Sequence, residues 1–198
     1  MRNILLVISI ALLIGACQKN EDPFFPKERG YPRVELPQAS YQKLEETREF
    51  TDYPYTFKYS QYAQAKPDTG QYTEPYWMEL YYPDWEATID ISYKPIPNFD
   101  SLVSFSNTSN VLTYKHQVRA EGIQEYRLKT KSGNIGMMFI LEGEVPSPFQ
   151  FYVTDSANHF FRAALYFPFT VEGDSLKPVV EFIKQDMMEM MNTVEWQR

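Results

Sequence analysis

The chain has 198 residues, of which 43% are hydrophobic and 16% aromatic, enough apolar material for one domain with a sizeable core. Its formal charge of −7 disfavours the phosphates of nucleic acids and anionic lipids, so we expect no nucleic-acid partner. It contains one cysteine, which excludes a disulfide within the chain.

The first residues have the composition of an export signal. An apolar run from Ile4 to Gly15 follows the positive charge of Arg2 and carries no charged or amide side chain. A membrane-spanning helix needs about 20 apolar residues, and this run is too short. A positive start, a short apolar core and small residues before the cleavage point are typical of a secretory signal peptide. We therefore predict that residues 1–16 are a signal peptide.

The cysteine follows this run directly. Ile14, Gly15, Ala16 and Cys17 resemble the bacterial lipobox, in which a diacylglyceryl thioether forms on the cysteine before cleavage. A free thiol is the weaker explanation, because a lone cysteine in an exported chain has no disulfide partner. We predict lipidation at Cys17, with each buried acyl methylene contributing roughly 0.8 kcal/mol to membrane binding. Gln18, in place of an aspartate, favours the outer membrane, and which face the protein occupies stays open.

The next segment has little periodic hydrophobicity. Residues 17–49 contain four spaced prolines, Pro23, Pro26, Pro32 and Pro37. Such a sequence favours an extended tether, of about 3.1 Å per residue where it is polyproline II. Tyr31, Val34 and Leu36 indicate that its later part docks on the domain. We predict a lipidated N-terminus and tether over 17–49, and a single globular domain over 50–198.

The first half of the domain alternates between strand and helix patterns. Apolar residues at every second position predict strands over 53–59, 76–82 and 85–93, and Pro83 with Asp84 indicates a hairpin turn. Spacings of three and four then predict a helix over about 101–119, with Asp100 as its N-cap. The residues of its apolar face are Leu102, Phe105, Ser109, Leu112 and His116.

The second half repeats this order. Strands are predicted over 122–130, 134–143, 148–155 and 159–167, with a tight hairpin at 155–158. A closing helix is predicted over about 175–195, capped by Asp174 or Ser175. Its apolar stripe consists of Leu176, Val179, Val180, Ile183, Met187, Met190, Met191 and Val194.

Three strands, a helix, four strands and a helix define the expected fold class. Consecutive strands with few helices favour an α+β fold, with an antiparallel sheet of about seven strands packed with helices. This order resembles the sandwich topology of the PsbP and Mog1-like families. The resemblance concerns the fold and carries no chemistry.

The pattern of reactive side chains does not predict an active site. His116 and His159 are the two histidines, and neither stands at a metal-ligand spacing. Asp84 and Glu86 could serve a glycoside hydrolase only at a suitable separation, a condition that any carboxylate-rich sequence can meet. We therefore predict no catalytic residue, no metal ligand and no cofactor.

Other residues are candidates for contacts with a partner or ligand. Exposed aromatic rings could pack on a protein or stack on sugar rings, and we select Tyr72, Tyr76, Trp77 and Tyr82. Clustered methionines form adaptable binding surfaces, and Met188 falls outside the predicted apolar stripe of the last helix.

Three short motifs resemble an Asp-Ser/Thr-aliphatic O-glycosylation pattern. They occupy residues 100–102, 155–157 and 174–176. Each also stands where a helix cap or turn favours Asp and Ser. Modification at these positions is left open.

Several blocks of the sequence are distinctive together. They are the lipobox, "WEATIDISYKPI", "LTYKHQVRAEGI" and "FYVTDSANHFF". With them, nearly the whole mature chain resembles the gliding-motility lipoprotein family GldD. The resemblance implies a non-enzymatic envelope lipoprotein, needed for gliding motility and the linked type IX protein secretion, that works with other lipoproteins of that apparatus. Many members carry a cysteine near the second strand, where this chain has Tyr76 and Trp77.

Two classes of function follow from these predictions. The first is a scaffold or assembly factor that binds other envelope proteins. The second is a lipoprotein that binds a glycan or small ligand through its exposed aromatic residues. A continuous apolar surface would favour the first class, and a concave aromatic cleft with polar rims would favour the second.

Overall fold

The structure is a computed structural model that describes residues 35–168 and 176–197. The expected signal peptide, Cys17, the first part of the tether and the expected cap at Asp174 or Ser175 lie outside the described residues. These described residues belong to one compact unit.

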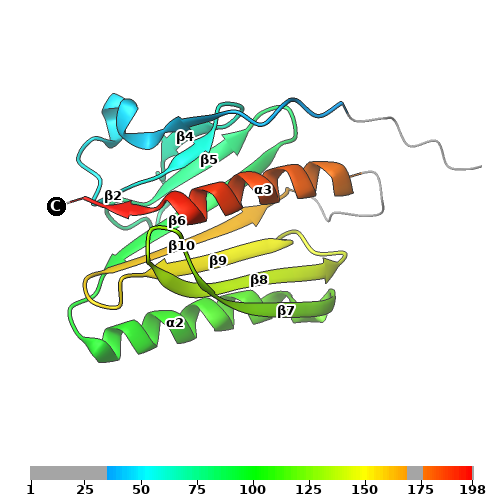
Figure 1. Ribbon diagram of the computed structural model, residues 1–198. Helices are drawn as coiled ribbons and strands as arrows, with labels where there is room; N and C mark the ends of the chain where they lie inside the picture. The colour runs from blue at the N-terminus through cyan, green and yellow to red at the C-terminus, as the bar shows by residue number, and fades with distance from the viewer. Residues whose placement is uncertain (1–34, 169–175, 198) are drawn as a thin grey trace, which may run out of the picture. The chain divides into compact units, whose positions relative to one another are not determined.

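A seven-stranded sheet organises the domain (Figure 1). Its strand order is β4-β5-β6-β10-β9-β8-β7, and every neighbouring pair is antiparallel. The strands are β4 (Gln64–Pro67), β5 (Met78–Tyr82), β6 (Ala87–Pro95), β7 (Ala120–Lys129), β8 (Ile135–Gly143), β9 (Phe149–Thr154) and β10 (His159–Tyr166).

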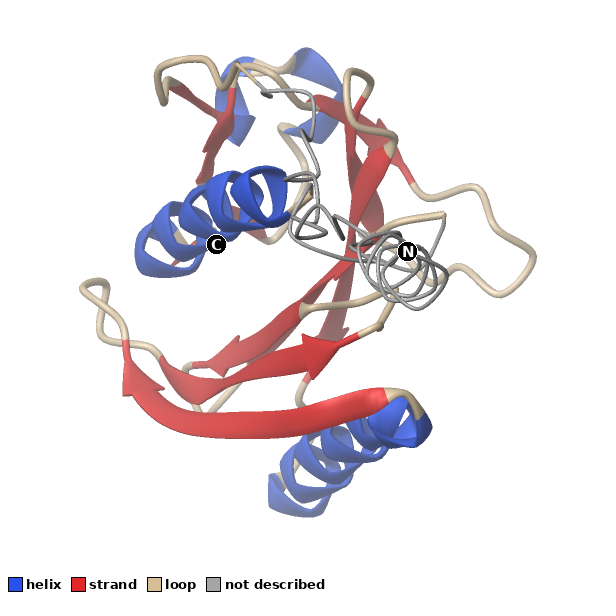
Figure 2. Cartoon of the chain, turned by 90° about the vertical axis from the view of Figure 1, so that its right-hand side faces the viewer, coloured by secondary structure: helices blue, strands red, loops and turns tan. Residues whose placement is uncertain are grey.

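Two long helices cover opposite faces of this sheet (Figure 2). Helix α2 (Phe99–Tyr114) continues into the 3-10 turn η3 (Lys115–Val118), and α3 (Lys177–Thr193) follows the last sheet strand. The predicted α+β class with an antiparallel sheet is therefore confirmed. Among the described helices, none is long and apolar enough to cross a membrane.

Two short strand pairs lie outside the main sheet. β1 (Tyr41–Lys43) pairs with β3 (Lys58–Ser60), and β2 (Tyr55–Thr56) pairs with β11 (Glu195–Trp196). The prediction that residues 53–59 form a strand of the main sheet is therefore wrong. The main sheet contains β4 in place of that strand. Tyr55, Phe57 and Tyr59 do alternate, but they pack onto the core as a covering layer.

The folded part also begins earlier than residue 50. The short helices η1 (Leu44–Glu46) and η2 (Arg48–Phe50) follow β1 directly, and the side chains of Leu44 and Phe50 are buried. Residues 41–49, which we assigned to the tether, therefore belong to the domain.

The main core lies between the sheet and α3. Phe161 on β10 is at its centre, with ring centroids of Tyr55, Phe57 and Phe151 at 5.1, 5.7 and 6.1 Å. A smaller cluster fills the space between the sheet and α2. It contains Phe139, Tyr152 and Phe160, against which Leu102 and Phe105 of the helix pack.

The buried face of α3 agrees largely with the predicted stripe. Val179, Ile183, Met187, Met190, Met191 and Val194 are buried, whereas Leu176 and Val180 are partly exposed. Phe182 and Asp186 are buried as well, although the sequence pattern did not place them on this face.

The turns and caps follow the expected chemistry with one difference. The N-cap of α2 is Asn98, whose side-chain oxygen accepts a hydrogen bond from the Ser101 amide at 2.9 Å, so the assignment of Asp100 is wrong by two residues. At the β9–β10 hairpin, Asp155 Oδ1 accepts hydrogen bonds from the amides of residues 157, 158 and 159. The β5–β6 hairpin forms at Pro83 and Asp84 as predicted.

Asp186 is an acidic side chain inside the core, and it makes stability depend on pH. Tyr82 donates a hydrogen bond from its hydroxyl to Asp186 Oδ2 at 3.1 Å. Burial raises the pKa of Asp186, and hydrogen bonds from hydroxyls including Tyr82 offset part of this effect. Because the folded state holds this proton more tightly than the unfolded state, the carboxylate destabilises the fold above its folded pKa.

We expect Asp186→Asn to stabilise the domain at neutral pH, since an amide oxygen can still accept from Tyr82 without a buried charge. The gain should shrink as the pH falls toward the unfolded pKa of an aspartate, where the native side chain is protonated too. Urea unfolding of both proteins between pH 4 and pH 8 measures the difference. A gain that is equal at both ends of this range would contradict the assignment.

Candidate functional site

The aromatic residues selected from the sequence lie mainly in the loop between β4 and β5. Tyr72 is 84% exposed and Tyr76 is 43% exposed. The Tyr76 backbone has a φ of 68°, and its ring packs edge-on against Tyr53 and Tyr93 at 5.5 and 6.0 Å. Trp77 is half-buried and donates from Nε1 to the Tyr93 carbonyl at 3.0 Å. Contacts within the domain thus fix the side chains of Tyr76 and Trp77, whereas the side chain of Tyr72 is largely exposed.

The two other selected residues differ from each other. Tyr82 is fully buried, so its selection as an exposed contact is wrong. Its position in β5 places it on the core face of the sheet, where its hydroxyl reaches Asp186. Met188 is 39% exposed on α3, as its place outside the apolar stripe predicted.

The histidines belong to separate, mainly aromatic surroundings. His159 is stacked on Trp196 at 4.8 Å, and its Nδ1 shares a 2.8 Å hydrogen bond with the hydroxyl of Tyr93. His116 lies beside Tyr166, and burial together with Arg162 lowers its pKa. In residues 35–168 and 176–197, no group of three or more His, Cys, Asp or Glu side chains could hold a metal ion.

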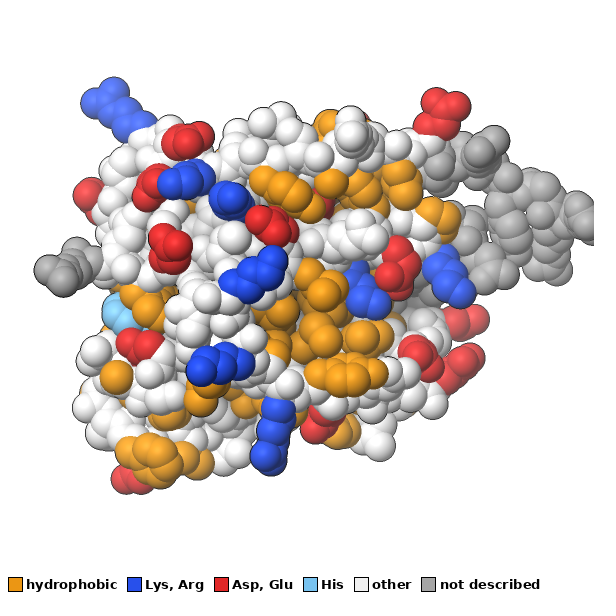
Figure 3. All heavy atoms as spheres, viewed as in Figure 1, with side chains coloured by type: hydrophobic (Ala, Val, Ile, Leu, Met, Phe, Trp, Pro, Cys, Tyr) orange, Lys and Arg blue, Asp and Glu red, His pale blue; other side chains and the backbone are white. Residues whose placement is uncertain are grey.

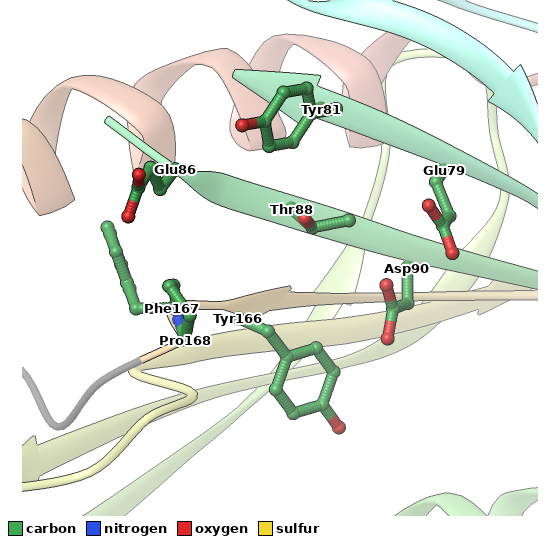
Figure 4. Close-up of a pocket in the computed structure, with 8 residues that line it drawn as sticks. All are labelled: Glu79, Tyr81, Glu86, Thr88, Asp90, Tyr166, Phe167 and Pro168. Atoms are coloured by element: carbon green, nitrogen blue, oxygen red, sulfur yellow. The ribbon is translucent and has the colours of Figure 1, made fainter. Parts of the chain in front are cut away.

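An open acidic groove lies on the α2 side of the sheet, where β5 and β6 are exposed (Figure 4). Glu79 and Asp90 are direct cross-strand neighbours. Like charges in this arrangement repel. Burial, followed by the carboxylates of Glu79 and Asp68, raises the pKa of Asp90 to about 6, and Arg162 partly offsets this. Glu86, one of the two carboxylates considered for glycoside hydrolysis, lines the groove, whereas Asp84 does not. Together these groups create a negative surface that would attract cations.

A second groove runs between α3 and the β8 region of the sheet, where apolar side chains gather beside the helix (Figure 3). Val180 and Ile140 line it. Its rim carries charges of both signs, from Glu121, Glu142, Glu144, Glu181, Lys177 and Lys184.

The largest unexpected feature is the outer face of α2. Helix α2 and η3 carry five exposed large apolar side chains, which we call the α2 outer stripe: Phe99, Val103, Val111, Tyr114 and Val118. Val118 is 94% exposed, Phe99 74% and Val111 60%. Their spacings of three, four and eight residues place them on one side of the helix. This side lies opposite Leu102, Phe105, Ser109 and Thr113, which face the sheet.

The orientation of α2 is fixed by contacts on its inner side. Thr113 donates from Oγ1 to Gln150 Oε1 at 3.1 Å, and Arg162 donates to the same oxygen. Leu102 and Phe105 pack into the smaller core. Since these groups hold the inner face against the sheet, most of the α2 outer stripe is presented away from it, and only the Tyr114 hydroxyl reaches back, to Glu125 at the β7 edge.

The α2 outer stripe was not predicted from the sequence, although a signal for it was present. A helix that packs on one side of a sheet normally has a polar outer face. From Phe99 to Val118, however, the charged side chains are only Asp100, Lys115 and, when protonated, His116. Apolar residues on both sides of a helix indicate a second contact surface.

These features define an antiparallel α+β domain whose described grooves are open to the surface. The profile of the family described as gliding motility lipoprotein GldD matches residues 21–196. The chain therefore belongs to this family. Membership also makes it a lipid-anchored protein of the cell envelope, associated with gliding motility.

No curated protein sequence matches the chain. The solution structure of cyanobacterial PsbP (CyanoP) from Synechocystis sp. PCC 6803 is similar over 84% of this chain and 98% of that chain, with 11% identity and a TM-score of 0.43. Nothing about the function of this chain follows from that likeness.

Proposed function

We propose that the protein is a non-enzymatic assembly factor or scaffold of the cell envelope, acting in gliding motility and the associated type IX protein secretion. Its partners would be other envelope lipoproteins of that apparatus. The observation that carries the proposal is the α2 outer stripe, because several large apolar side chains exposed on one side of a helix mark a contact surface for proteins. Family membership supports the motility context.

The alternative, a glycan-binding lipoprotein, has weaker support in the geometry. A sugar site of this kind needs several aromatic faces that converge on a concave surface. Tyr82 is buried, Trp77 is half-buried beneath Lys94, and the Tyr76 ring packs on other tyrosines. Tyr72 is then the only one of the four selected aromatics whose side chain is largely exposed.

A single carboxylate in the α2 outer stripe tests the scaffold proposal. Val111→Glu should leave thermal stability unchanged, since exposed substitutions usually shift it by no more than about 0.5 kcal/mol. It should reduce co-purification of envelope partners by about tenfold or more, because a charge would be buried at the contact. The measurement is quantitative affinity purification from crosslinked envelopes, with gliding scored in parallel.

The matched control is Gln61→Glu, which adds the same charge at an exposed turn of the domain. It should change neither co-purification nor gliding. Unchanged co-purification in Val111→Glu would remove the α2 outer stripe as the docking surface. If Met188→Glu loses binding and Val111→Glu does not, the contact lies on α3 and not on the α2 outer stripe.

The proposal includes a lipid anchor at Cys17 and a location in the outer membrane. Cys17→Ala should abolish incorporation of a clickable fatty acid, since it removes the only thiol in the chain. It should also release the protein from the membrane fraction, because the mature chain would lack its acyl chains. Retained label in the variant would show that another group carries the lipid.

A further inference from the structure

The two edges of the main sheet differ in how they are protected. The β4 edge has four residues and ends at Pro67, which cannot donate a backbone hydrogen bond. The β7 edge is ten residues long and contains no proline. Within the described part of the chain, β7 has a strand neighbour only on its β8 side. Its outer backbone groups can therefore accept another strand.

Charges along β7 are sorted by sign. Glu121 and Glu125 lie in its first half, whereas Arg127 and Lys129 lie in its second half, and Lys131 follows. All five side chains are exposed. Charges that only prevent edge association need no such order. An antiparallel copy of the same strand, however, places the acidic half of one chain against the basic half of the other.

One register pairs the charges nearest the centre of β7. In a symmetric antiparallel pair with a twofold axis at Tyr126, Glu125 of each chain faces Arg127 of the other, and Gln124 faces Leu128. Moving the axis by one residue places Glu125 against itself or Arg127 against itself. Opposite charges favour cross-strand pairs and like charges disfavour them. The register centred on Tyr126 pairs Glu125 with Arg127, whereas one centred on Gln124 would pair Glu121 with Arg127 and leave Glu125 opposite Ile123, so the charges favour Tyr126.

The side chains near this axis are available and partly held in position. Tyr126 is 44% exposed on the same sheet face as its neighbour Met138. The opposite face carries Glu125, whose carboxylate accepts a hydrogen bond from the Tyr114 hydroxyl. Because Tyr114 restrains this carboxylate, less conformational freedom is lost when it pairs with an arginine.

We propose that two copies of this chain pair through their β7 edges in the register centred on Tyr126, which joins the two main sheets into one. The paired edge is small for a stable interface, so the dimer is favoured where anchoring in a membrane concentrates the chains. Of the α2 outer stripe, the proposal uses only Tyr114, through its hydrogen bond to Glu125.

A cysteine on the axis tests the register. In the full chain, expressed in its native envelope, Tyr126→Cys should give a disulfide-linked dimer after mild oxidation, because its Cα would lie within disulfide range of its own copy. Wild type reports any dimer formed through Cys17. Ile123→Cys, which faces Lys129 in this register, should crosslink poorly by itself. Equal dimer yields at both positions, or none at Tyr126→Cys, would overturn the proposed register.

A charge exchange tests the complementarity. Arg127→Glu places carboxylates against Glu125 of the partner at both sites and should weaken dimerisation by about tenfold. Adding Glu125→Arg restores opposite charges between identical chains and should recover the dimer. Each charge variant also carries Tyr126→Cys, and the yield of the disulfide-linked dimer is the readout. Thermal unfolding of each variant confirms that the domain remains folded. A double variant that is folded and still monomeric would refute the proposal, as would an unchanged dimer in Arg127→Glu.

Discussion

Phe161→Ala is expected to reduce the free energy of unfolding by about 3–5 kcal/mol. Phe161 is fully buried, and its ring contacts aromatic residues from the sheet and from the covering layer. Truncation would remove these contacts together and leave a cavity that the surrounding rings cannot fill without moving. Urea unfolding followed by tyrosine and tryptophan fluorescence gives the value.

The control for this substitution is Phe99→Ala, which removes the same side chain from a position that is 74% exposed. It should shift stability by no more than about 0.5 kcal/mol. Similar losses at both positions would mean that Phe161 is not central to the core.

Ile183→Ala is expected to cost roughly 2–5 kcal/mol, a large share of a typical total of about 5–15 kcal/mol. Ile183 is fully buried where α3 packs on the sheet, between Val179 and Met187 on the same helical face. Thermal or urea unfolding measures the loss. Function should fail in parallel, because the unfolded fraction rises with it.

Met188→Glu is the comparison on the same helix. Its exposed position predicts a change of no more than about 0.5 kcal/mol. Unfolding of the domain by Met188→Glu would contradict the rotation of α3 about its axis in the structure.

Most of the fold could be predicted because its signals are local. Alternation in 85–93 predicted β6, and the Asp-Ser hairpin between β9 and β10 follows from side-chain bonds to the nearby backbone. The position of residues 53–59 could not be predicted in this way. Alternation shows that one side of a strand is buried, but it does not show which strand is the neighbour.

The contact surfaces were harder to predict for a related reason. The identity of an aromatic residue does not show whether it lies on the surface or in the core. Tyr82 shows this, since its hydroxyl donates a hydrogen bond to Asp186, which lies on a helix 104 residues later in the sequence. Met188 could be placed on the outside because helical periodicity alone determines the side on which it lies.

The pairing of β2 with β11 has a consequence for how the protein is made. Residues 55–56 find their partner strand only at residues 195–196, and the indole of Trp196 then donates to Asn134 at 2.8 Å. Contacts between such distant parts of a chain form late, because a long loop must close first. The domain therefore cannot complete its fold before residues 195–196 have been synthesised. A chain that completes its fold late would stay unfolded for longer, which would suit the export that we predict from its first 16 residues.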